Sequence, residues 1–134
     1  MVLLRGSCQC GGVQFELPDT FEVRTFCHCT TCKKLSGGVG TANGRIPSDD
    51  LRITEGTELL RTYQPEEGST KTFCSVCGSN LFGGGWPDSD HASVRLSALD
   101  DPVPGRPKKH IYVRSVASWE TLPDDGLERV EASG

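Results

Sequence analysis

The chain has 134 residues, a length that fits one compact domain. Its formal net charge is −4, with Lys+Arg 14 against Asp+Glu 18 and no basic run longer than two lysines, which argues against a nucleic-acid partner. The 16 glycines and 8 prolines interrupt the chain too often for long helices. Only three apolar residues follow Met1 before Arg5, too few for a secretory leader or a membrane span. We therefore expect a soluble, cytoplasmic protein.

Alternating apolar and polar residues predict a mostly β fold. The expected strands cover residues 12–17, 22–26, 51–54, 58–63, 70–73, 80–82, 92–96 and 110–114. The first two of these strands are expected to form a hairpin, and one short helical turn is expected at residues 30–36, ending at Gly37. We predict a single domain over residues 1–122 and a frayed C-terminal tail over residues 123–134.

Seven cysteines fall in three groups along the chain. The C-x-x-C-G sequence of Cys74 and Cys77 is typical of a zinc knuckle, in which a tight turn brings both sulfur atoms to one ion. Cys8 and Cys10 are two residues apart, so in an extended chain both side chains face the same side. Together the two pairs supply four thiolates, the closed tetrahedral set of a structural zinc site.

The middle group holds Cys27, Cys29 and Cys32, which is one ligand fewer than a closed zinc site needs. An incomplete ligand set is typical of a catalytic metal, because water or substrate can bind the remaining position. His28 is expected on the face opposite to its neighbouring cysteines, so it is a poor fourth ligand and belongs in a hydrogen bond or a pocket wall. Lys33 and Lys34 directly follow Cys32 in the sequence. They are expected either to attract an anionic substrate or to lie in solvent.

Other interpretations of the cysteines are weaker. A disulfide framework conflicts with the odd number of cysteines and the missing leader, and unliganded core thiols rarely cluster at such short spacings. Iron–sulfur ligation remains open, although the C-x-C-x-x-C run differs from ferredoxin spacings. His91 and His110 are each isolated in the sequence and are expected to be surface or hydrogen-bonded histidines outside the site.

Three segments resemble the glutathione-dependent formaldehyde-activating enzyme family, which includes centromere protein V. They are GSCQCGGV at residues 6–13, CHCTTCKKLSG at residues 27–37 and FCSVCGSNL at residues 73–81. The sequence HIYV at residues 110–113, followed by Trp119, is also similar to this family, so the resemblance covers about residues 5–122. It implies a β-tent of antiparallel sheets, also found in Rab-exchange chaperones and methionine sulfoxide reductases of the B type.

The resemblance also implies the chemistry. It suggests two zinc ions per chain, a structural zinc at Cys8, Cys10, Cys74 and Cys77 and a catalytic zinc at Cys27, Cys29 and Cys32. Members of the family are carbon–sulfur lyases that join glutathione to formaldehyde as S-hydroxymethylglutathione. We therefore expect a zinc-dependent lyase acting on a small thiol such as glutathione and a small carbonyl compound. The alternative is a non-catalytic, zinc-stapled module for protein interaction, which has no use for an incomplete ligand set.

Overall fold

The computed structural model describes residues 2–133 and confirms a mostly β fold with one short α-helix. In chain order the elements are β1 (Leu3–Ser7), β2 (Gln14–Pro18), β3 (Val23–Cys27), α1 (Thr30–Ser36), β4 (Thr41–Pro47), β5 (Arg52–Glu55), β6 (Leu60–Tyr63), β7 (Lys71–Cys74), β8 (Asn80–Gly83), β9 (His91–Arg95), β10 (Lys109–Ile111) and β11 (Glu128–Arg129). Short 3₁₀ turns at Ser48–Asp50, Thr57–Leu59, Leu96–Ala98 and Val113–Ser115 join some of the strands.

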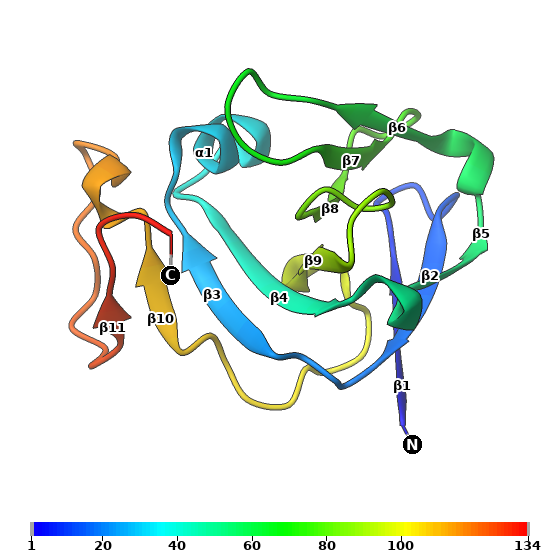
Figure 1. The fold of residues 1–134 in the computed structure, drawn as a ribbon, viewed down its shortest axis with the longest axis horizontal. Coiled ribbons are helices and arrows are strands. Elements are labelled where there is room, and N and C mark those ends of the chain that lie inside the picture. Colours follow the sequence, from blue (N-terminus) through cyan, green and yellow to red (C-terminus); the bar gives the residue numbers. More distant parts are fainter. Residues whose placement is uncertain (1, 134) are drawn as a thin grey trace.

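The strands form two sheets (Figure 1). The small sheet has the order β1-β2-β5, and the large sheet has the order β11-β10-β3-β4-β9-β8-β7-β6. Most neighbours are antiparallel, but β10 runs parallel to both β3 and β11. In Figure 1 β10 and β11 lie at the left, beside β3, while β1 and β2 lie at the right.

The expected hairpin between residues 12–17 and 22–26 is wrong, because β2 and β3 belong to different sheets. β2 pairs instead with β1, which places Leu4 opposite Leu17, and both of these leucines are buried. β3 pairs with β4, a strand that the apolar alternation does not reveal because Gly44 interrupts it. A Cβ atom at Gly44 would lie 2.4 Å from the ring of Phe21, so this position needs glycine for close packing.

The core consists of inward-facing side chains from both sheets. Phe15 of β2 meets Phe82 of β8 edge to face, with ring centroids 5.0 Å apart. Leu17, Ile46 and Val94 are fully buried around this pair. These contacts join the two sheets into one packed unit. The strands that carry the cysteines belong to this unit.

Helix α1 spans Thr30–Ser36, as the sequence predicts. Cys29 is its N-cap residue, with the Cys29 sulfur accepting a hydrogen bond from the Cys32 backbone N–H at 3.3 Å. Gly37 ends the helix in the left-handed conformation, with φ 70°, and its N–H bonds the Lys33 carbonyl. The capping residues of this helix therefore also shape the turn that carries Cys29 and Cys32.

Residues 123–133, where the sequence predicts a frayed tail, contain β11 and are bonded to the large sheet. The Val130 N–H donates to the His110 carbonyl at 2.8 Å, and the Tyr112 N–H donates to the Ala132 carbonyl at 2.9 Å. The segment is polar, so its attachment depends on these backbone hydrogen bonds and on the hydrogen bond between Asp125 and His110. A pattern of apolar residues does not reveal such contacts.

Candidate metal centres

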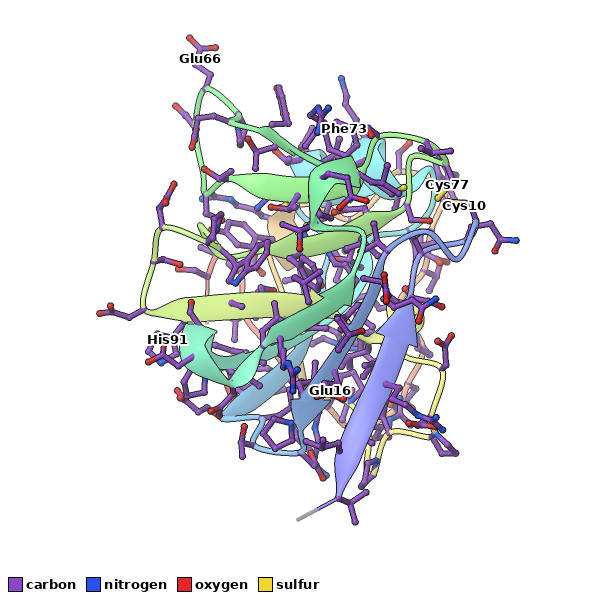
Figure 2. All side chains as sticks on the ribbon, turned by 90° about the vertical axis from the view of Figure 1, so that its right-hand side faces the viewer. Cys10, Glu16, Glu66, Phe73, Cys77 and His91 are labelled. Carbon is purple, nitrogen blue, oxygen red and sulfur yellow. The ribbon has the colours of Figure 1, made fainter. Side chains whose placement is uncertain are left out.

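The first cysteine group comes from two distant parts of the chain. Cys8 and Cys10 follow β1, Cys74 ends β7, and Cys77 lies in the turn before β8. The four sulfur atoms all lie within 4.8 Å of one another. The Cys8 and Cys10 sulfurs are 3.5 Å apart, and those of Cys10 and Cys74 are 3.9 Å apart. Figure 2 shows Cys10 and Cys77 side by side at one edge of the molecule.

Local hydrogen bonds arrange these sulfur atoms. The turn after Cys74 is closed by the Gly78 N–H, which donates to the Cys74 carbonyl at 2.8 Å, and Gly78 has a φ of 79° that favours glycine. The Val13 N–H donates to the Cys8 sulfur at 3.2 Å. Hydrogen bonds from the Ser79 hydroxyl and backbone N–H lower the pKa of Cys77 to about 5. These donors favour thiolates, the form in which cysteine binds metal.

The second group lies where β3 leads into α1. Cys27 is the last residue of β3, Cys29 caps the helix and Cys32 is in its first turn. Their sulfur atoms lie within 4.8 Å of one another, with those of Cys27 and Cys32 3.5 Å apart. Hydrogen bonds with Cys29 and Cys32 raise the pKa of Cys27, whereas hydrogen bonds with Cys27 and Cys29 lower the pKa of Cys32. Because the three sulfur atoms are so close, they cannot all be thiolates without strong repulsion. A bound cation would neutralise this negative charge.

Both groups fit a tetrahedral zinc ion. Four sulfur atoms at the usual zinc–sulfur bond length lie about 3.8 Å from one another. The three separations given above, of 3.5 to 3.9 Å, agree with that value, and the other sulfur pairs lie within 4.8 Å. Thiolates are also ligands that zinc prefers. All seven cysteines are free of disulfides. The donor sets are therefore a closed one of four and an incomplete one of three.

Neither ring nitrogen of His28 takes part in the cysteine group. Its Nε2 lies 2.9 Å from Nδ1 of His110, and its Nδ1 lies 3.3 Å from the Val39 carbonyl oxygen. Burial lowers the pKa of His28, against the opposing effect of the hydrogen bond with Val39. On the far side, Nε2 of His110 donates to the Asp125 carboxylate at 2.8 Å. A buried chain of two imidazoles and one carboxylate thus fixes the backbone between Cys27 and Cys29.

A cavity of about 450 Å³ opens beside the three cysteines. Cationic side chains in its wall belong to Lys71, Arg95 and Arg114, against a single acidic one, Glu67. Tyr112 and Ser115 add hydroxyl groups. This arrangement suits a small anionic ligand.

The two lysines that the sequence places next to Cys32 are not in this wall. The Lys33 ammonium donates to the Ser115 backbone carbonyl, and Lys34 is exposed on α1. The cations nearest to the cysteines in sequence are therefore not those that line the cavity.

Two residues near the three cysteines escape the sequence analysis. His110 is the hydrogen-bonded one of the two kinds of histidine expected, and it is buried behind the cysteine loop because β10 pairs directly with β3 and sets His110 opposite Phe26. Arg95 lies in an expected strand, and only the pairing of β9 with β4 sets it beside Asn43. Arg95 belongs to no recognisable motif, and the HIYV sequence at residues 110–113 assigns no role to His110, so only the three-dimensional pairing reveals where the two side chains lie.

Metal analysis of the purified protein tests the two donor sets. We expect about two zinc ions per chain, with the three-cysteine ion removed first by a chelator because it has fewer protein ligands. Elemental analysis before and after stepwise chelation measures both ions. Protein that holds no zinc and contains intact disulfides would contradict metal binding altogether.

The fold and the site define a β-sheet protein with a closed set of four cysteines and an incomplete set of three beside a basic cavity. The sequence profile of the glutathione-dependent formaldehyde-activating enzyme family matches residues 3–115. The chain belongs to this family.

Known proteins support this assignment. A protein of Halomonas elongata that carries the family's name is 34% identical over 96% of this chain and 86% of its own length. A relative in Talaromyces marneffei with the same family name is 28% identical, over 57% of this chain and 42% of its own. A crystal structure of a Rhodobacter sphaeroides protein superposes with a TM-score of 0.58 at 26% identity, covering 75% of this chain and 91% of that one. Within residues 2–133, no helix is long and apolar enough to cross a membrane.

Proposed function

We propose that this protein is a zinc-dependent carbon–sulfur lyase that joins glutathione to formaldehyde as S-hydroxymethylglutathione. Cys27, Cys29 and Cys32 hold the catalytic zinc, and Cys8, Cys10, Cys74 and Cys77 hold a structural zinc. The observation that carries the proposal is the incomplete cysteine set in the wall of a basic cavity, in a chain of this family.

Zinc bound to three thiolates supplies a Lewis acid that lowers the pKa of a substrate thiol. In the reaction a carbon–sulfur bond forms between the thiol and the carbonyl carbon, and the proton lost by sulfur ends on the carbonyl oxygen. Tyr112 and Ser115 line the cavity, and their hydroxyls are suited to donate a hydrogen bond to that oxygen. Lys71 and Arg114 are suited to bind the carboxylates of glutathione.

We also propose that the protein acts in the cytoplasm, where glutathione keeps thiols reduced. Its seven free cysteines are consistent with a reducing compartment. Its expected partners are small molecules, a thiol and a small carbonyl compound. The net charge of −4 gives no support to a nucleic-acid partner.

Exchange spectroscopy tests the activity directly. Formaldehyde labelled with carbon-13 and glutathione also form their adduct without a catalyst, and we expect the zinc-loaded protein to accelerate this exchange in proportion to its concentration. Cys29→Ala should remove the acceleration, whereas Lys34→Ala, at an exposed position outside the cavity, should retain it. An exchange rate with zinc-loaded protein equal to the uncatalysed rate would exclude the lyase and leave the non-catalytic module.

A further inference from the structure

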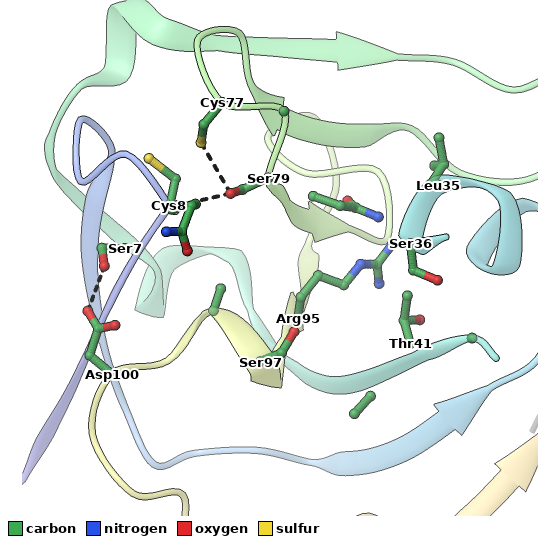
Figure 3. A pocket seen from close by; sticks show the side chains of 16 residues that line it. Ser7, Cys8, Leu35, Ser36, Thr41, Cys77, Ser79, Arg95, Ser97 and Asp100 are labelled. Carbon is green, nitrogen blue, oxygen red and sulfur yellow. Dashed lines mark hydrogen bonds between the residues drawn. The ribbon is translucent and has the colours of Figure 1, made fainter. Parts of the chain in front are cut away.

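A second cavity, of about 700 Å³, shares Arg95 in its wall with the cysteine cavity. Polar side chains dominate its wall, among them Ser36, Thr41, Ser79, Asn80 and Ser97 (Figure 3). Its size falls within the usual range of small-molecule sites. The proposed lyase reaction gives this cavity no role.

Five buried side-chain atoms within residues 2–133 lack a protein hydrogen-bond partner, and their distribution is not random. They are Thr41 Oγ1, Asn80 Nδ2, Asn80 Oδ1, Arg95 Nε and Arg95 Nη2. All three residues line the 700 Å³ cavity, and only Arg95 also lines the cysteine cavity. Buried polar groups in proteins are almost always satisfied, so a cluster of such atoms in one wall indicates a polar ligand.

Arg95 shows what kind of ligand this is. Its side chain is buried, with only 3% of its surface exposed, and Nη1 donates to Asn43 Oδ1 at 2.7 Å. Nε and Nη2 form the opposite edge of the guanidinium, whose two parallel N–H bonds match the two oxygens of a carboxylate. None of the salt bridges within residues 2–133 involves Arg95. Arg95 interacts electrostatically with Cys27, Cys29 and Cys32, but no acceptor in this part of the chain bonds Nε or Nη2. Two unpaired N–H groups of a buried guanidinium are costly, and the oxygens of an anionic ligand would offset that cost.

We propose that this cavity binds a single carboxylate group, with the free edge of Arg95 holding both oxygens and with the Asn80 amide and the Thr41 hydroxyl donating further hydrogen bonds to the same oxygens. Figure 3 shows the guanidinium extending toward Ser36 and Thr41, while Asp100 lies on the opposite side of the cavity. Asp100 accepts a hydrogen bond from the Ser7 hydroxyl at 2.8 Å. Its charge repels a second anionic group, so the cavity accepts one carboxylate group and not two.

The carboxylate has two chemical sources. It belongs either to the thiol substrate, in which case Arg95 holds one of its carboxylates in place of Lys71 or Arg114, or to a separate molecule. Acetate as a probe contains no thiol, so its binding is independent of the proposed lyase activity and the two proposals can fail separately.

Nuclear magnetic resonance of nitrogen-15-labelled, zinc-loaded protein tests the site. We expect acetate to shift the Arg95 Nε–H signal and the Asn80 side-chain amide signals in a saturable way, whereas neutral acetamide leaves them unchanged. Arg95→Lys keeps the charge but loses the parallel donors, and it should weaken acetate binding about tenfold as judged by the Asn80 signals. Lys108→Met, at an exposed position outside both cavities, is the control and should bind acetate as the natural chain does.

Asn80→Ala tests the same site if the Arg95→Lys protein does not fold. It leaves Arg95 in place and should still weaken acetate binding severalfold. An Arg95 signal that does not respond to acetate, or that responds equally to acetamide, would overturn the proposal, as would undiminished binding in both cavity variants. Titrating glutathione at saturating acetate then separates the sources. Competition assigns the site to the substrate's own carboxylate, and independent binding assigns it to a separate carboxylate molecule.

Discussion

Cys74→Ala is expected to leave the protein largely unfolded at room temperature. Cys74 is fully buried at the end of β7, and its sulfur lies 3.9 Å from that of Cys10. A structural zinc site contributes on the order of 10 kcal/mol to folding, comparable to the whole free energy of unfolding of an ordinary domain. Loss of one of four ligands forfeits much of this contribution. Circular dichroism during urea unfolding, with zinc analysis of the folded fraction, measures the effect.

Cys29→Ala is the matched variant, because it removes one cysteine from the other group. Cys29 lines the cysteine cavity and is the N-cap residue of the short helix α1. Loss of such a cap lowers the free energy of unfolding by about 1 kcal/mol. We expect this variant to fold, to lose the second zinc and to lose activity. Equal losses of stability and of zinc in the two variants would show that the cysteine groups do not have separate roles.

The cobalt-substituted protein is expected to bind glutathione through sulfur, with a sulfur-to-metal charge-transfer band that grows as the thiol is added. S-methylglutathione should leave the band unchanged, because its sulfur carries no proton to lose. The expected contrast is between a saturable increase and none, and Cys29→Ala should abolish the response. Visible absorption during the titration provides the measurement.

The reason lies in the charge of the ligand set. Three thiolates and a divalent cation together carry a net charge of −1, so this metal would be a weaker acid than zinc held by neutral ligands. Water needs a very large pKa shift to ionise at neutral pH, whereas a thiol starts near 8.5 and needs a small one. We therefore expect thiol chemistry and not hydrolysis. A band that responds to no thiol, beside a stable metal-bound water, would instead favour the non-catalytic module.

Cysteine spacing predicts the two sulfur groups well because each short motif fixes local geometry. The C-x-C pair and the knuckle at Cys74 and Cys77 are recognisable alone, and the structure brings them within 4.8 Å. The helix at residues 30–36 is likewise set by local signals, its capping residues Cys29 and Gly37.

Strand pairing is much less accessible from the sequence. The short connection between residues 12–17 and 22–26 favours a hairpin, but the burial of Leu4 against Leu17 outweighs proximity along the chain. The same limit hides Arg95 and His110. Their partners, Asn43 and His28, are 52 and 82 residues away, and polar side chains on the inward face of a strand leave no periodic signal.

The parallel pairing of β10 with β3 has a consequence for biosynthesis. All seven cysteines have been translated by residue 77, yet the imidazole behind the loop of Cys27 and Cys29 arrives at residue 110 and its carboxylate at residue 125. A ribosome adds about 5–20 residues per second, so the nascent chain carries every thiol for seconds before the loop gains its backing. During that interval the four-cysteine group has all its ligands, whereas the three-cysteine loop lacks the support that holds it in shape. The order of translation thus favours metal loading of the four-cysteine group before the three-cysteine group.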